Sequence, residues 1–187
     1  MISEDEWENL QVSRLPKLKG KLYLGIKFGH DGTHVAMSVA AKTASGKVFV
    51  EVLDCQSIRN GNSWILNFLK QADWKQVVVD GANGQQLLAN EMSELRLHKP
   101  ILPTVKEIIL ANATFEQALY GETLVHAGQP SLAQVVTNCE KRNIGTSGGF
   151  GYRAQIEEHE IALMDSMILA HWACSHAKPA QKQQVYY

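Results

Sequence analysis

The sequence predicts an α/β domain built on a mixed sheet of five or more strands flanked by helices. Two observations support this prediction. Three strand-like segments follow one another at residues 22–28, 34–41 and 47–53, and the connectors at residues 29–32 and 43–46 have the composition of hairpin turns. After them, helical patterns alternate with short apolar strands, which favours a parallel part of the sheet. An antiparallel meander therefore precedes the parallel strands.

The bulk properties fit one globular domain. The chain has 187 residues, enough to bury one sizeable core. Its formal net charge of -1 excludes a uniformly basic nucleic-acid-binding domain, although a local basic patch stays compatible with it. Three scattered cysteines are too few for a zinc cluster and favour a reducing compartment. No apolar run approaches the roughly 20 residues that span a bilayer, and the acidic N-terminus is not a secretion signal.

The chain divides into three predicted regions. Residues 1–20 are expected to be an inter-domain linker or N-terminal arm, with a short helix at residues 3–10 that Ser3 and Glu6 begin as a capping box. Residues 21–175 are expected to form the folded domain. Residues 176–187 are polar and are expected to be a flexible tail.

The second half of the domain is expected to be mainly helical. Strands are predicted at residues 76–80 and, closed by a proline, at residues 100–103, with a short extended piece at residues 123–126. Residues 144–152 are rich in glycine and are expected to form a flexible loop or ribbon. Helices are predicted at residues 63–72, 85–95, 105–120, 131–142 and 157–174.

Two isolated aspartates are the strongest chemical signal. Asp80 ends a strand of three valines, and the carboxyl ends of such strands are where open α/β sheets place ligands. Asp165 lies within an apolar helical pattern, where a carboxylate is costly unless it is paired, solvated or bound to a cation. Together they suggest a metal site, and oxygen ligands would select Mg²⁺ or Mn²⁺. A turn cap at Asp80 and an ion pair at Asp165 are the simpler alternatives.

Four segments stand out in order along the chain: Leu-Gly-Ile-Lys-Phe-Gly at residues 24–29, Val-Val-Val-Asp-Gly-Ala-Asn-Gly at 77–84, Pro-Thr-Val-Lys-Glu-Ile at 103–108 and Ala-Leu-Met-Asp-Ser at 162–166. With these segments, the order of elements resembles the ribonuclease H-like fold, and in particular the C-terminal nuclease domain of the large terminase subunit of tailed bacteriophages. The resemblance covers roughly residues 20–175. The order of the segments is more specific than any one of them. In this topology the first and fourth strands lie side by side.

The resemblance implies a catalytic site with one departure. Asp80 matches the second catalytic acid of the family and Asp165 the third, but Lys27 stands where the family has its first aspartate. Three explanations are open. Asp31, in the following turn, reaches back as a metal ligand, or it is only a turn residue. Glu158 substitutes from the helix that carries Asp165, or it is only a solvated residue of the first helical turn. Otherwise the site is weakened, and Lys27 contacts phosphate or replaces one cation.

Basic residues near this site are candidates for binding DNA. The glycine-rich ribbon would let a backbone approach phosphates closely, and such contacts carry no sequence information. Solvated surface charges are the alternative for each residue. The candidates are Lys106, Lys141, Arg142 and Arg153.

By resemblance, the function is that of a phage or prophage endonuclease. It would cut concatemeric double-stranded DNA with two Mg²⁺ or Mn²⁺ ions and little sequence preference. Expected partners are an ATPase domain on the same polypeptide, the small terminase subunit and the portal, in the host bacterial cytoplasm and without a membrane. The main alternative is a weakened module for DNA binding or assembly. An ATP-binding module of the actin and sugar-kinase group, or a junction resolvase or transposase, are further alternatives.

Overall fold

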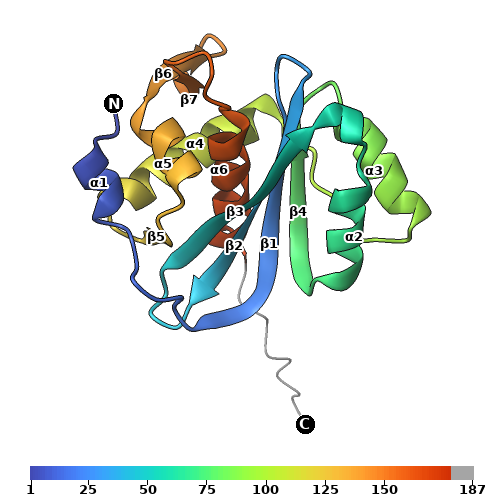
Figure 1. Cartoon of the computed structure of the whole chain (residues 1–187), viewed down its shortest axis with the longest axis horizontal. Helices are drawn as coiled ribbons and strands as arrows, with labels where there is room; N and C mark the ends of the chain where they lie inside the picture. The colour runs from blue at the N-terminus through green and yellow to red at the C-terminus, as the bar shows by residue number, and fades with distance from the viewer. Residues whose placement is uncertain (178–187) are drawn as a thin grey trace.

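The computed structural model of the chain describes residues 1–177. Its centre is a sheet with the order β4-β1-β2-β3-β5 (Figure 1). β1 (Leu18–Phe28), β2 (His34–Thr43) and β3 (Val48–Ser57) form the predicted antiparallel meander. β4 (Trp74–Asp80) and β5 (Leu124–His126) pair in parallel with β1 and β3. The mixed sheet and the adjacency of the first and fourth strands are therefore confirmed.

Helices cover both faces of the sheet. α2 (Ser63–Gln71) and α3 (Gln85–Glu94) lie on one side in Figure 1, and α4 (Val105–Tyr120), α5 (Pro130–Thr137) and α6 (Ala162–Ser175) lie on the other. Each face of the sheet packs against its own hydrophobic core, and the valines of β4 contribute to both. Val77 and Val79 pack with α2 and α3, whereas Val78 packs on the side of α6. A continuous apolar strand is buried on both faces, as expected for the centre of an α/β sheet.

The N-terminal helix α1 (Glu4–Glu8) packs onto the domain. Ser3 and Glu6 form the predicted capping box, and Trp7 is buried with 2% of its surface exposed. The Trp7 and His126 rings stack with centroids 4.0 Å apart, and the His126 Nε2 lies 2.7 Å from the Trp7 carbonyl oxygen. β1 begins at Leu18, within the predicted arm. A linker role for residues 1–20 stays a prediction, but their first half is part of this core.

Three element predictions were wrong. Residues 100–103 form a single bridge between Ile101 and Val78, since the flanking Pro100 and Pro103 have no N–H for a longer ladder. The helix expected at residues 131–142 ends at Thr137. From there the chain forms a hairpin of β6 (Cys139–Ile144) and β7 (Gly149–Ala154). The hairpin contains both the end of the predicted helix and the predicted glycine-rich ribbon at residues 144–152.

The third error concerns the last helix. It was expected from residue 157 but begins at Ala162, because residues 155–161 form bends and turns. Asp165 is therefore in the first turn of α6 and not in its middle. The tail predicted at residues 176–187 lies almost entirely outside the described residues. No helix within residues 1–177 is long and apolar enough to cross a membrane.

Candidate active site

Lys27 and Asp80 meet because the register of the parallel pair β1–β4 places them side by side. Their side chains form an ion pair, with 2.5 Å between Lys27 Nζ and Asp80 Oδ2. Lys27 is buried, with 5% of its surface exposed. A buried ammonium group is costly without a partner, and Asp80 supplies that partner. Where the family resemblance expects an acid, the structure thus contains a cation that contacts the second acid.

The turn after β4 holds Asp80 against the end of β1. Gly81 has a φ of 116°, which favours glycine, and a Cβ there would overlap the Phe28 carbonyl oxygen. A Cβ at Gly84 would overlap the Phe28 ring, and the Asn83 side chain donates a hydrogen bond to the Gly29 carbonyl at 3.1 Å. The glycines after Asp80 are therefore required by close packing between two strand ends.

Asp165 reaches the same place from α6. This helix crosses β1 at Gly25, where a Cβ would overlap the Ser166 carbonyl oxygen, and the Ser38 and Ser166 hydroxyls are 2.7 Å apart in the buried contact with β2. Burial raises the pKa of Asp165 to about 6, and the nearby carboxylate of Asp80 raises it as well, although Lys27 and Arg142 act in the opposite direction. Raised acid pKa values are typical of functional sites.

One pocket of about 270 Å³ contains these groups. Asp80 lies at the carboxyl end of β4, Asp165 on the first turn of α6, and Arg142 on the hairpin. Burial lowers the pKa of His30 in this pocket, and the charges of Lys27 and Arg142 lower it further. The polar residues that line the pocket are Lys27, His30, Asp80, Asn112, Arg142 and Asp165.

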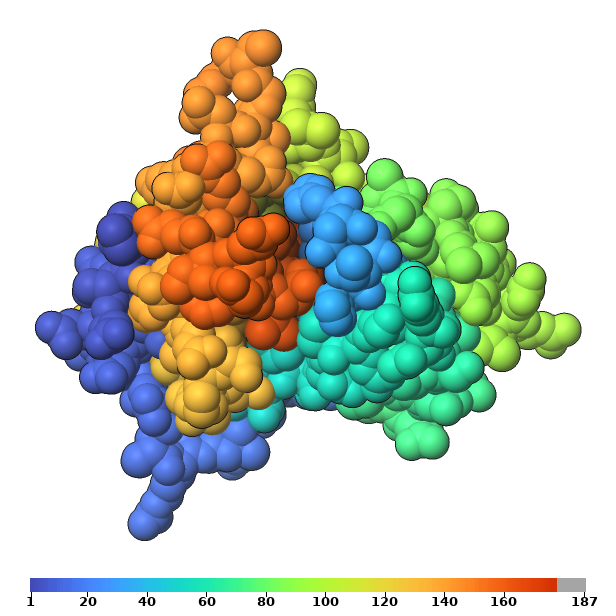
Figure 2. Space-filling view, turned by 45° about the horizontal axis from the view of Figure 1, so that its top comes forward, coloured from blue at the N-terminus to red at the C-terminus, as the bar shows by residue number. Residues whose placement is uncertain are grey.

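Asp31 and Glu158 line a different pocket. This pocket lies between the turn after β1 and the segment that precedes α6, two segments that the space-filling view shows side by side (Figure 2). Asp31 accepts a hydrogen bond from the Thr33 backbone at 3.0 Å, as a turn residue does, and hydrogen bonds from Thr33 lower its pKa and outweigh the opposing effect of burial. Glu158 precedes α6, so it does not lie on the helix that carries Asp165.

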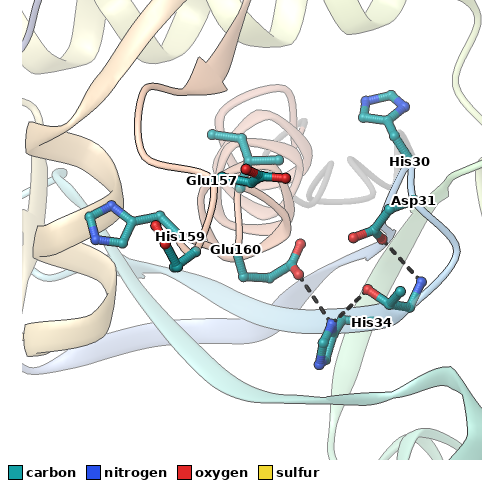
Figure 3. Close-up of a pocket in the computed structure, with 9 residues that line it drawn as sticks. His30, Asp31, His34, Glu157, His159 and Glu160 are labelled. Carbon is teal, nitrogen blue, oxygen red and sulfur yellow. Dashed lines mark hydrogen bonds and ion pairs between the residues drawn. The ribbon is translucent and has the colours of Figure 1, made fainter.

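The second pocket has a polar contact of its own. His34 Nδ1 lies 3.3 Å from Glu160 Oε2, and Figure 3 shows His159 on the opposite side, away from His34 and Asp31. His30 lines both pockets. The structure therefore brings together Lys27, Asp80 and Asp165, and places Asp31 and Glu158 in the neighbouring pocket.

The four basic residues predicted to bind DNA lie in different surroundings. Arg142 lines the pocket of the two aspartates. Lys141 pairs with Glu116 at 2.5 Å and lies over the Phe150 ring, and Arg153 pairs with Glu140 at 2.6 Å. Lys106 is exposed in the first turn of α4. The hairpin that carries Arg142 stands out from the body of the molecule (Figure 2).

Two pocket residues were missed by sequence reasoning. His30 and Asn112 line the pocket but are not among the site residues predicted from the sequence. Asn112 lies on α4 with 5% of its surface exposed. A polar residue at a buried position of an amphipathic helix was the available signal, because buried polar groups need partners.

The residues present do not fit two metal ions. A two-ion site needs several carboxylates that bridge cations about 3.5–4 Å apart. Within residues 1–177, no three His, Cys, Asp or Glu side chains gather in a way that could hold a metal ion. Asp80, moreover, already contacts the ammonium group of Lys27.

Solved structures share this fold. The large terminase of bacteriophage HK97 matches with a TM-score of 0.65 and 13% identity over 92% of this chain and 43% of that one. The large terminase nuclease of thermophilic phage G20c with bound magnesium matches with a TM-score of 0.62 and 14% identity over 91% and 97%. The nuclease domain of the bacteriophage SPP1 large terminase with bound manganese matches with a TM-score of 0.50 and 12% identity over 81% and 85%.

The class of fold is therefore established: it is the ribonuclease H-like fold of large terminase nuclease domains. At this identity the likeness shows the fold alone. The chain spans less than half of the HK97 large terminase and nearly all of the G20c nuclease. No protein-family model matches the sequence, and no curated protein matches it significantly.

Proposed function

We propose that the chain is the nuclease domain of a phage DNA-packaging terminase and that its Asp80–Asp165 pocket acts on the phosphate backbone of double-stranded DNA. By this proposal it works beside an ATPase domain, the small terminase subunit and the portal in the host cytoplasm. A divalent ion such as Mg²⁺ or Mn²⁺ would supply charge stabilisation and an activated water.

The convergence of Asp80 and Asp165 on one pocket is the observation that carries this proposal. The two residues are 85 positions apart by sequence number and come from β4 and α6, yet they line the same cavity. Arg142 adds a guanidinium group at its edge, which is suited to bind a phosphate oxygen through charge-assisted hydrogen bonds. These chain groups bind and orient a phosphodiester without contacts to the bases.

The Lys27–Asp80 ion pair favours a nuclease whose cleavage activity is weakened. Lys27 satisfies the charge of Asp80 and replaces the acid that would have been a further ligand. A cation in direct contact with Asp80 competes with any metal ion for the same carboxylate. We therefore infer a domain that binds DNA through Arg142 and the hairpin and cleaves it slowly.

Plasmid nicking tests the proposal. The purified chain would be incubated with supercoiled DNA in Mn²⁺, in Mg²⁺ and in EDTA, together with Asp80→Ala and Lys27→Asp. We expect slow metal-dependent nicking by the wild type, none by Asp80→Ala, and nicking at least tenfold faster by Lys27→Asp. DNA binding is measured in parallel by fluorescence anisotropy of a labelled duplex.

The outcomes distinguish a weakened nuclease from a disarmed one and from a protein without this function. DNA binding without nicking by the wild type, with nicking gained in Lys27→Asp, would mean a disarmed nuclease. Rapid wild-type nicking that Lys27→Asp does not improve would contradict the weakened form. Neither binding nor nicking in any variant would overturn the proposed function.

A further inference from the structure

Two neighbouring segments of the sheet carry basic residues and no acidic ones. The first is the approach to β1 and its start, residues 14–21, and the second is the end of β2 with the turn that follows, residues 42–47. The strand register brings the two segments together, because Lys19 pairs with Lys42 across β1 and β2. We call the positive residues here the basic end of the sheet, and they are Arg14, Lys17, Lys19, Lys42 and Lys47.

The charges of the basic end are not balanced by neighbouring acids. Directly opposite side chains of an antiparallel pair lie on the same face, so Lys19 and Lys42 place like charges side by side, which costs stability. Within residues 1–177 none of the residues of the basic end forms an ion pair, whereas the adjacent Lys21 pairs with Asp73 at 3.3 Å. Lys42 is half-buried and the other four are exposed. The basic end is therefore a surface that favours an anionic partner.

The basic end is remote from the pocket of the two aspartates. Lys19 lies near the start of β1 and Lys27 near its end, so at about 3.3 Å per residue they are roughly 25 Å apart. Figure 1 shows the start of β1 at the bottom of the sheet and the end of β4, where Asp80 lies, at the top. Nearer the pocket, Lys141 and Arg153 of the hairpin are engaged by glutamates. The larger unbalanced positive charge is thus at the opposite end of the sheet.

We propose that the basic end is a second DNA-binding surface, which contacts the backbone phosphates of a duplex separately from the Asp80–Asp165 pocket. Lysine and arginine side chains make phosphate contacts that carry no sequence information. A phosphate between Lys19 and Lys42 would replace their repulsion by attraction to a shared anion. Charges spread over two strands and a turn fit a polyanion with regularly spaced phosphates better than one small anion. The inference rests on the proposed function, because duplex DNA is the ligand in both, and it adds a separate surface.

DNA binding in EDTA tests this inference without cleavage. The full chain would be titrated onto a labelled duplex at several salt concentrations, with binding followed by fluorescence anisotropy. The double variant Lys19→Gln with Lys42→Gln should bind at least tenfold more weakly at low salt. Its slope of log affinity against log salt should be smaller by about 2, one for each lost phosphate contact. Lys70→Gln with Lys99→Gln removes the same charge from exposed positions elsewhere and should change the affinity less than twofold.

Stability separates a DNA-binding lysine from a structural one. Lys42 lines a cavity together with Ser175 of the last turn of α6, where a cation also stabilises the helix dipole. Lys19→Gln is therefore the cleaner single variant. It relieves the like-charge contact, so at low salt it should melt at or above the wild-type temperature, yet it should bind the duplex at least threefold more weakly. A lysine that only supports the fold would instead lose stability on substitution and leave the DNA affinity unchanged.

Two results would overturn the inference. One is equal DNA affinity of the Lys19/Lys42 double variant and its control. The other is displacement of the labelled duplex by polyglutamate as effectively as by unlabelled duplex, because the surface would then suit an acidic peptide and not phosphates.

The binding and nicking readouts keep the two proposals apart. DNA binding that depends on Lys19 and Lys42, without nicking by the wild type or by Lys27→Asp, would contradict the proposed cleavage alone. Nicking by a chain whose DNA binding depends on Arg142 but on neither lysine would contradict this inference alone.

Discussion

At the residue scale, burial opposes the charge of the Asp165 carboxylate. Burial raises its pKa to about 6, above the value of about 3.9 expected in the unfolded chain. The folded state then binds the proton more tightly than the unfolded state. The contribution of Asp165 is therefore most favourable below pH 4, and it is lost as pH rises from about 4 through 6.

Asp165→Asn should remove this dependence. At pH 8 and in EDTA the variant should be more stable than the wild type by about 2 kcal/mol, because no charge is buried. At pH 4 the two should have nearly equal free energies of unfolding. Urea denaturation at both pH values measures the difference. A wild type that is the more stable of the two at pH 8 would show that a partner stabilises the charged carboxylate.

Arg142 and Arg153 form a matched pair on the hairpin. Arg142 lines the site, but Arg153 is engaged by Glu140. Arg142→Ala should weaken binding to duplex DNA several-fold and lower the slope of log affinity against log salt by about 1, as expected for one lost phosphate contact. Arg153→Ala should change neither quantity appreciably. Anisotropy titrations between low and moderate salt measure both, and equal effects of the two variants would argue against a pocket-directed role for Arg142.

At the scale of elements, the contact between α6 and the sheet positions Asp165. Gly25 of β1 faces the backbone of α6 at Ser166 and Ala170 so closely that no Cβ fits. The neighbouring Ser38–Ser166 hydrogen bond holds the same crossing on β2. A close helix–strand approach with a fixed polar contact determines the position of the first turn of α6.

Gly25→Ala should disturb this crossing. The added methyl group must displace backbone and not a flexible side chain, so we expect a loss of about 3 kcal/mol in the free energy of unfolding. Because the shift occurs next to Asp165, Mn²⁺ affinity should fall as well. Ser38→Ala, which removes the hydroxyl but adds no bulk, should cost about 1 kcal/mol. Chemical denaturation ranks the two variants, and a Gly25→Ala chain as stable as Ser38→Ala would contradict the close packing.

At the scale of the whole molecule, the N-terminal segment is part of the core. Trp7 stacks on His126 of β5, whose Nδ1 accepts from the Gly128 N–H while its Nε2 donates to the Trp7 carbonyl. Burial lowers the pKa of His126, although the hydrogen bond to the Trp7 carbonyl raises it. The helix before β1 thus covers the edge of the sheet farthest from β4.

Trp7→Ala should destabilise the whole domain by about 3 kcal/mol, as large-to-small changes of buried aromatic residues do. Leu15→Ala is the control, since Leu15 has 67% of its surface exposed and should shift stability by less than about 0.5 kcal/mol. Thermal denaturation followed by circular dichroism measures both. A Trp7→Ala chain with wild-type stability would mean that residues 1–12 are dispensable for this fold.

The sequence by itself determined the class of fold, the meander and the two aspartates. Alternating and continuous apolar segments report burial locally, and Asp80 and Asp165 are conspicuous because they interrupt such segments. It did not determine where the last helix begins or that residues 139–144 are a strand. Both depend on partners elsewhere in the chain: β7 pairs with β6, and the turns before α6 pack against the turn after β1.

Only the tertiary structure decided the composition of the candidate site. Lys27 and Asp80 are neighbours through the register of two strands, and Asn112 joins them through the packing of α4 on α6. Asp31 and Glu158 line the adjacent pocket, which the turn after β1 forms with the segment before α6. Side-chain chemistry can be recognised along a sequence, but whether two charges neutralise one another depends on distance, which the fold alone sets.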